Sequence, residues 1–168
     1  MEYAERNLKA EDGTDLVLFH TGWSTFSNFH PMPMTINGQK YRSVEQYYQV
    51  AKAKRFGDVN RVIEILNSRS PRKCKELGKH VQGFDMEVWK KEARSVMKTG
   101  LLEKFLQNGS ARQKLKDTGR AIIAEATKYD QFWATGLDIS DDANAKRDSW
   151  PGRNVLGELL MKVRDMIP

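Results

Sequence analysis

Four polar side chains recur along residues 44–56 at the spacing of one helical face. Glu45, Tyr48, Gln49 and Lys52 occupy positions i, i+3, i+4 and i+7, which lie above one another on an α-helix. A carboxylate and an amine on one face can supply an acid or base and a nucleophile. An exposed polar face is the more frequent reason for such a pattern, so the spacing leaves both interpretations open.

The segment before this helix carries aromatic and amide side chains. Residues 20–33 mix glycine, serine, proline and aromatic residues, as loops do, and they include Phe26, Asn28, Phe29 and His30. Loops of this composition line pockets in which flat bases stack. We therefore expect this loop to contribute substrate contacts beside the polar helix face.

A second cluster of carboxylate and aromatic residues lies at residues 129–133 (YDQFW). Asp130 stands between aromatic residues there, and Glu125 precedes the cluster. These residues could supply a carboxylate and a stacking ring to a site. Core packing explains Phe132 and Trp133 somewhat better when the residues are taken alone.

A third segment, residues 149–154 (SWPGRN), has the composition of an anion-binding helix start. Arg153 brings a positive charge, and the free backbone N–H groups at the start of a helix attract anions. Asn154 is also a favoured N-cap residue, so an ordinary helix cap explains the segment equally well.

The composition predicts one basic, cytoplasmic domain. The chain has 168 residues and a formal charge of +6, which favours anionic ligands such as phosphates, nucleotides or nucleic acid. Ordinary surface lysines explain that charge about as well. No window reaches the roughly 18 apolar residues of a membrane span, and the charged N-terminus lacks the apolar stretch of a secretory signal. Cys74 is the only cysteine, which indicates a reducing compartment and excludes an internal disulfide.

Histidine and cysteine usage argues against a metal centre. The histidines, His20, His30 and His80, have no i, i+4 pairing, and no ligand spacing typical of zinc is present. Cys74 lies between Lys73 and Lys75, which could lower the pKa of its thiol, but a structural role in an amphipathic helix is the better interpretation. We expect neither a metal nor an organic cofactor.

The hydrophobic pattern predicts a mainly α-helical α+β fold with a small β component. We expect a loose lead-in at residues 1–14 and one domain at 15–168. Strands are expected at 15–19 and 121–126, a hairpin turns through Asn37-Gly38, and helices follow at 44–56, 59–67, 71–78, 86–107, 110–117 and from 155 onward.

These motifs, in their order and spacing, resemble the NADAR (YbiA-like) family. The resemblance covers about residues 17–166 and rests on 26–29 (FSNF), 43–49 (SVEQYYQ) with Lys52, Ser70-Pro71, Gly78, Trp89, Lys104-Phe105, 129–133 (YDQFW), Gly136-Leu137, 150–154 (WPGRN), Leu156-Gly157, Leu160-Met161 and Arg164. One position departs from the family: Ala134 stands where glycine commonly follows the tryptophan, and its Cβ could narrow the pocket.

The resemblance implies an N-glycosidase and a set of site residues. Glu45, Lys52 and Asp130 are the implied catalytic residues, with Lys52 attacking the anomeric carbon of a ribose and forming a Schiff base. The expected substrate-binding residues are Phe26, Asn28, Phe29, Arg42, Tyr48, Gln49, Trp89, Glu125, Trp133, Gly136, Arg153 and Asn154. Among these, Arg42 and Arg153 are suited to hold a diphosphate.

Three functions compete on this basis. The first is removal of ADP-ribose from a base, especially guanine, in nucleic acid. The second is N-glycosidase action on phosphoribosyl-amino-pyrimidine intermediates of riboflavin biosynthesis, small ribosyl phosphates. The third is non-catalytic binding of ADP-ribose or NAD-like ligands. A pure binder needs no lysine beside the anomeric carbon, so the pair of Glu45 and Lys52 favours an enzyme.

Overall fold

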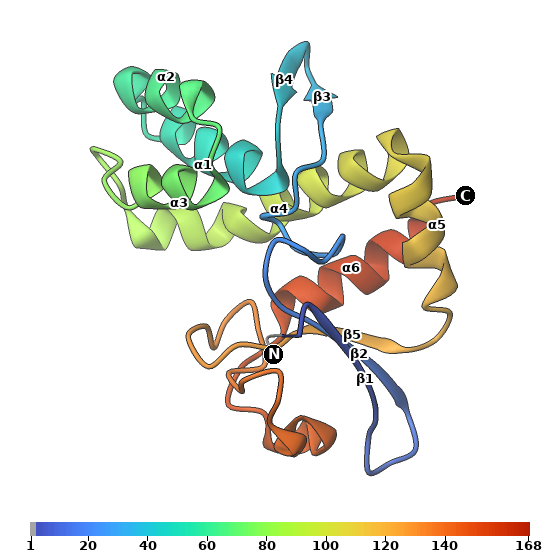
Figure 1. Cartoon of the computed structure of the whole chain (residues 1–168). Coiled ribbons are helices and arrows are strands. Elements are labelled where there is room, and N and C mark those ends of the chain that lie inside the picture. Colours follow the sequence, from blue (N-terminus) through green and yellow to red (C-terminus); the bar gives the residue numbers. More distant parts are fainter. Residues whose placement is uncertain (1–2) are drawn as a thin grey trace. The chain divides into compact units, whose positions relative to one another are not determined.

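A computed structural model describes residues 3–168 and confirms the mainly helical α+β class (Figure 1). The strands are β1 (Glu5–Lys9), β2 (Asp15–Phe19), β3 (Met34–Ile36), β4 (Gln39–Tyr41) and β5 (Ile122–Glu125). The α-helices are α1 (Val44–Arg55), α2 (Val59–Asn67), α3 (Pro71–Gly78), α4 (Met86–Gln107), α5 (Gly109–Asp117) and α6 (Val155–Met166), and two 3-10 helices are η1 (Asp142–Ala145) and η2 (Arg147–Ser149). None of the helices within residues 3–168 combines the length and apolar character that a membrane span requires.

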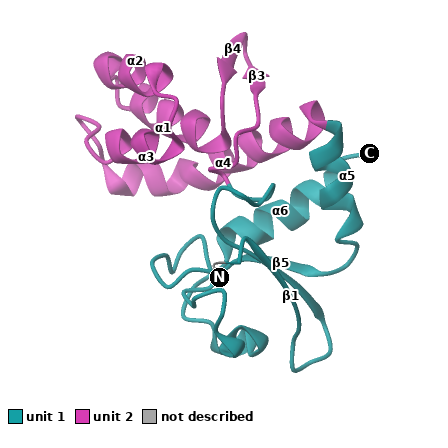
Figure 2. Cartoon of the chain, viewed as in Figure 1, with its two compact units in different colours: residues 1–27, 109–168 teal, residues 28–108 magenta. Residues whose placement is uncertain are grey.

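The chain divides into two compact units (Figure 2). Unit 1 contains the described residues up to Ser27 together with Gly109–Pro168, and unit 2 contains Asn28–Asn108. Residues from both ends of the sequence therefore build unit 1, while the middle of the sequence builds unit 2.

Unit 1 is organised by a three-stranded sheet in the order β1-β2-β5. β2 lies in the middle, antiparallel to β1 and parallel to β5, with Leu16 opposite Ile122. Alternating side chains of β2 enter the core, where Leu16 and Leu18 are fully buried. The helix α6 packs on β5.

β1 corrects the expectation of a loose lead-in, because Glu5–Lys9 pairs with the whole of β2. The sequence of β1, ERNLK, has one large apolar residue among polar ones, so its alternation is too weak to predict a strand. β1 is an edge strand whose backbone pairs with β2. The sequence alone does not reveal which strand β1 pairs with.

Unit 2 is built around α1, which packs against α2, α3 and α4. The helix begins as predicted, because the Ser43 hydroxyl accepts a hydrogen bond from the backbone N–H of Gln46 at 3.1 Å. The predicted hairpin is also present. Asn37 and Gly38 both have positive φ, 51° and 79°, as a type I′ turn requires.

The start of α6 lies in close contact with β5. The Asn154 backbone is left-handed, with φ of 50°, and its side chain makes no cap hydrogen bond. Instead, Asn154 Nδ2 donates to the carbonyl of Ile123 at 3.0 Å. A Cβ on Gly157 would stand 1.9 Å from that same carbonyl oxygen, so the glycine is required for this approach.

We predict that Gly157→Ala destabilises the protein by about 1–3 kcal/mol, as overpacking of a tight contact does. Gly109→Ala is the matched control. Its new Cβ would find its nearest heavy atom, of Arg112, at 3.9 Å, so it should leave the free energy of unfolding unchanged or slightly raise it. Urea unfolding followed by circular dichroism measures both variants. Equal stability of the two would contradict the close contact.

Candidate active site

The polar face of α1 is buried, which overturns the alternative of an exposed face. Glu45 is 6% exposed, Tyr48 9% and Gln49 5%, and Lys52 is half-buried. Since α2, α3 and α4 all pack against α1, polar side chains here have little access to water. Groups buried in this way require specific partners.

Glu45 is held through its backbone and through its carboxylate. Its backbone N–H donates to the carbonyl of Asn28 at 3.1 Å, which ties α1 to the aromatic loop. One helical turn further on, Gln49 Nε2 donates to Glu45 Oε1 at 2.9 Å. The carboxylate therefore stands in a fixed position inside unit 2.

Gln49 is in turn fixed by the absence of a side chain at Gly78. A Cβ on this last residue of α3 would stand 1.8 Å from Gln49 Oε1 and 2.4 Å from Gln49 Cδ. Among the described residues, Gln49 Oε1 finds no hydrogen-bond donor, so its amide is oriented by the bond to Glu45 and by packing on Gly78. Gly78 thus acts on the carboxylate through Gln49. From the sequence alone, Gly78 was predicted only as the residue that ends a helix.

Lys52 lies two turns after Glu45, and its ammonium faces an aromatic ring. Its Nζ is 5.4 Å from the ring centroid of Phe84. Burial lowers the pKa of Lys52, and the charge of Glu45 opposes that shift in part. A lysine with a lowered pKa has a larger neutral fraction, and only the neutral amine is a nucleophile.

Trp89 and Tyr48 pack behind this face. Trp89 is 5% exposed, and its Nε1 donates to the Tyr48 hydroxyl at 2.9 Å. Its ring also lies edge-on to Tyr48 and Phe56 at 5.4 and 6.4 Å. Trp89 therefore orients Tyr48 from within the core of unit 2, and its expected contact with a substrate stays a prediction.

The aromatic loop divides between the two units. In unit 2, Asn28 Nδ2 lies 3.3 Å from Met97 Sδ, while Asn28 Oδ1 is buried without a hydrogen-bond partner in the described chain. Phe29 is half-buried in the same unit. In unit 1, Phe26 is 1% exposed and packs against Phe19 at 5.9 Å. The structure thus places Phe26 in a core, whereas Asn28 adjoins Glu45.

Arg42 has a structural task in unit 2. Its Nη1 donates to the carbonyls of Leu66 and Ser68, both at 3.1 Å, where α2 ends. Arg42 as a whole is exposed. The expected contact with a diphosphate stays a prediction.

In unit 1, Asp130 organises the aromatic cluster. Its Oδ1 accepts hydrogen bonds from the backbone N–H groups of Phe132 at 2.9 Å and Trp133 at 2.8 Å. The two rings meet edge to face at 4.7 Å, and Trp133 is half-buried. The Asp130 carboxylate therefore fixes the backbone of the turn that carries the Trp133 ring.

The other unit 1 residues surround this turn. The carbonyl of Glu125 accepts from Thr135 at 2.9 Å, and the carbonyl of the buried Ala134 accepts from Asn154 at 3.1 Å. Gly136 is buried with φ of 81°, and Arg153 is exposed. The predicted site residues thus form two groups, one in each unit.

Comparison with known proteins identifies the family. The model of the NADAR domain matches residues 18–168. The chain belongs to the NADAR domain family.

Relatives of this NADAR domain carry informative names. An N-glycosidase of Acanthamoeba polyphaga mimivirus is 34% identical over 89% of this chain and 94% of that protein. A riboflavin biosynthesis protein of Vibrio vulnificus is 32% identical over 83% of this chain, but over only 34% of that protein. The NMR structure of E. coli YbiA matches with a TM-score of 0.74 and 27% identity, covering 90% of this chain and 83% of that one. Further relatives are also named N-glycosidases, so this is an N-glycosidase family.

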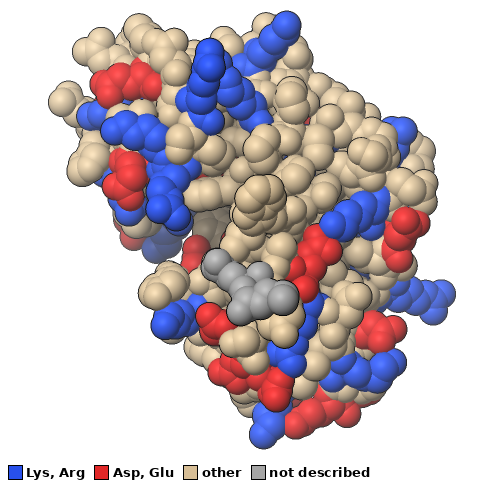
Figure 3. Space-filling model, viewed as in Figure 1, with Lys and Arg blue, Asp and Glu red and all other residues tan. Residues whose placement is uncertain are grey.

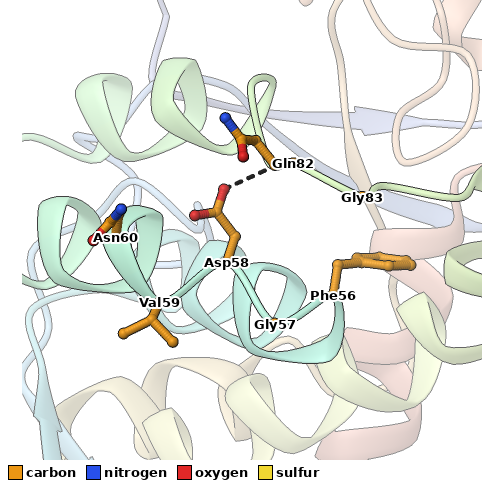
Figure 4. A pocket seen from close by; sticks show the side chains of 7 residues that line it. All are labelled: Phe56, Gly57, Asp58, Val59, Asn60, Gln82 and Gly83. Atoms are coloured by element: carbon orange, nitrogen blue, oxygen red, sulfur yellow. Dashed lines mark hydrogen bonds between the residues drawn. The ribbon is translucent and has the colours of Figure 1, made fainter.

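A pocket of about 400 Å³ lies at the junction between α1 and α2 of this NADAR domain (Figure 4). The lining carboxylate, Asp58, accepts from the backbone N–H groups of Gln82 at 2.9 Å and Arg61 at 3.1 Å. These bonds lower the pKa of Asp58 and make it a helix cap. The pocket contains none of the predicted site residues.

Metal-binding groups do not gather in the part of the chain that the structure describes. Residues 3–168 hold no cluster of three or more His, Cys, Asp or Glu side chains suited to a metal ion. Cys74 is buried, and burial raises the pKa of its thiol. This agrees with the structural role that we predicted for Cys74 and not with a reactive thiolate.

We predict that Glu45→Gln lowers the pKa of Lys52 further, because the carboxylate is the group that counteracts the effect of burial. Glu92→Gln is the control, since Glu92 pairs with Arg55 at 2.8 Å instead. NMR titration of the lysine side chains, with Lys52 assigned from a Lys52→Arg variant, measures the shift. An unchanged or raised pKa in Glu45→Gln would show that the two charges do not interact.

Proposed function

We propose that this N-glycosidase removes ADP-ribose from ADP-ribosylated guanine in nucleic acid, in the cytoplasm. The observation that carries the proposal is the pair on α1: a buried, hydrogen-bonded carboxylate at Glu45 and a lysine with a lowered pKa at Lys52. The net charge of +6 supports an anionic substrate. The lone, buried Cys74 fits a reducing compartment.

The chemistry of the pair suits cleavage at an anomeric carbon. When the bond between C1′ and the base nitrogen breaks, its electron pair leaves with the base and positive charge develops on C1′ and the ring oxygen. Glu45 stabilises that charge electrostatically. The neutral amine of Lys52 can then bond to C1′.

Water alone is needed to resolve the covalent intermediate. After attack, Lys52 Nζ loses a proton and the ring oxygen gains one, so the ribose opens and an imine forms between C1′ and Nζ. Water adds to the imine carbon, the C1′–Nζ bond breaks, and ADP-ribose leaves with its C1′ as an aldehyde that recloses onto the ring oxygen, which regenerates the amine. The departing base takes its proton from water, and Asp130, which lies in unit 1, stays a predicted catalytic residue.

The alternative substrate is a phosphoribosyl-amino-pyrimidine intermediate of riboflavin biosynthesis, and the name of the Vibrio vulnificus relative favours it. Incubation with an oligonucleotide that carries ADP-ribosyl-guanine, and separately with the riboflavin intermediates, distinguishes the two. Mass spectrometry should detect free ADP-ribose and an unmodified oligonucleotide. Release of ribose phosphate from the intermediates alone would establish the alternative, and release from neither would favour a binding module.

We predict that Glu45→Gln reduces turnover by at least ~10²-fold, a typical loss for a positioned catalytic group. The amide has nearly the same shape and lacks the charge that stabilises the developing cation. Glu92→Gln removes a carboxylate that pairs with the exposed Arg55 and should retain wild-type turnover. Turnover of a correctly folded Glu45→Gln variant near the wild-type rate would exclude the role.

A separate prediction concerns the covalent step at Lys52. Borohydride added during turnover should reduce the imine and leave a mass of ADP-ribose size on the peptide that contains Lys52. Lys52→Arg should abolish both trapping and turnover, because arginine keeps the charge but is no nucleophile at neutral pH. Lys54→Arg, at a neighbouring exposed position, should affect neither.

The same step sets the pH dependence. The neutral fraction of Lys52 grows as the pH rises towards its lowered pKa, so kcat/KM should increase with pH along an acid limb below the ordinary lysine range. An active Lys52→Arg variant that leaves no adduct would limit Lys52 to pairing with Glu45 or with a substrate phosphate.

A further inference from the structure

The positive charge of the chain is concentrated in unit 2. Residues 28–108 contain 16 Lys and Arg against 8 Asp and Glu, a net charge of +8, whereas the rest of the chain contains 12 against 14. Figure 3 shows Lys and Arg side chains gathered at the left of the molecule, where Figure 1 places α1 and α3. A charge difference of this size within one domain indicates where an anionic partner approaches.

Within unit 2, one exposed surface carries unpaired cations. We call Arg69, Arg72, Lys73 and Lys75 the α3 basic strip, and all four are exposed. None of them forms an ion pair with another described residue, and Glu76, which follows Lys75 in the sequence, is paired with Lys79 at 2.9 Å. The strip therefore offers its charges to a ligand without first breaking an existing pair.

The opposite face of α3 connects the strip to the catalytic carboxylate. Cys74, Leu77 and Gly78 are buried, and Gly78 lies against the Gln49 amide that holds Glu45. In the aromatic loop, the ring centroid of Phe29 lies 5.9 Å from Lys75 Nζ. The preceding residue, Asn28, accepts a hydrogen bond from the backbone N–H of Glu45 through its carbonyl. A ligand on the strip is thereby held at a fixed position relative to Glu45.

We propose that the α3 basic strip binds the phosphate backbone of the nucleic-acid strand that carries the modified base, an inference that rests on the proposed function. Arg72, Lys73 and Lys75 lie on α3, and Arg69 lies two residues before the helix begins, so the four charges are spread along seven residues and can meet successive phosphates of a strand. A mononucleotide substrate presents its phosphate at one point and would leave most of the strip unused.

The experiment compares two double variants that lose the same charge. Arg72→Gln/Lys73→Gln removes half of the strip, and Arg120→Gln/Lys162→Gln removes one exposed arginine and one exposed lysine from unit 1. Each is assayed on an oligonucleotide with ADP-ribosyl-guanine and on ADP-ribosyl-guanosine, over a range of salt concentrations. The strip variant should raise KM for the oligonucleotide about tenfold and leave kcat and the nucleoside reaction unchanged. The unit 1 variant should match the wild type.

The salt dependence identifies the phosphate contacts. The slope of log KM against log salt for the oligonucleotide should decrease by about 0.7 for each phosphate contact removed from a single strand. Equal slopes for the strip variant and the unit 1 variant would overturn the proposal. Equal losses on oligonucleotide and nucleoside, with an unchanged melting temperature, would also overturn it, because the strip would then act on the reaction itself.

Binding without catalysis separates this inference from the proposed function. If neither substrate is cleaved, the proposed function fails, and fluorescence anisotropy with an unmodified labelled oligonucleotide still tests the strip. Weaker, less salt-dependent binding by the strip variant alone supports it, and equal binding overturns it. Polyglutamate that displaces the oligonucleotide as effectively, charge for charge, as unlabelled nucleic acid would point to an acidic protein partner and overturn it as well.

Discussion

The buried carboxylate of Glu45 is the constraint on which the organisation of unit 2 depends. An ionised carboxylate away from water is costly unless hydrogen bonds and opposite charge compensate it. The structure supplies Gln49 Nε2 as a donor at 2.9 Å and the charge of Lys52 two turns away. Gln49 reaches that position only because α3 ends in a residue without a side chain, at Gly78. The packing of α3 on α1 and the position of the Glu45 carboxylate therefore depend on the same residue, Gly78.

The two charged groups on α1 also limit each other. Burial alone would lower the pKa of Lys52 further, and Glu45 restores part of the ammonium form. Removal of either charge would remove the electrostatic interaction between Glu45 and Lys52. In the proposed mechanism, a site that holds a carboxylate and supplies a neutral amine gives up stability for reactivity, a common compromise at functional sites.

Local signals in the sequence predicted the elements well. Each of these signals acts on neighbouring residues, so a few residues suffice to predict the element. They are Ser43 before α1, Ser70-Pro71 before α3 and Asn37-Gly38 in the hairpin. The helical spacing likewise brought Glu45, Gln49 and Lys52 to one face. Features with distant partners were not predictable. β1 depends on β2, and the side chain of Asn154 turns from its expected cap position to the carbonyl of Ile123.

The same limit applies to the residues that the motifs suggested for substrate binding. Phe26, Arg42 and Trp89 make contacts within the protein: a core ring pair, two carbonyls at the end of α2, and the hydroxyl of Tyr48. A motif marks the residues that a site needs, but it does not separate those that meet a ligand from those that hold the others in place. Gly78 has no reactive atom, yet it fixes Gln49 and through it Glu45. The motif residues around Glu45 thus contribute packing and a hydrogen bond that keep its carboxylate buried and oriented.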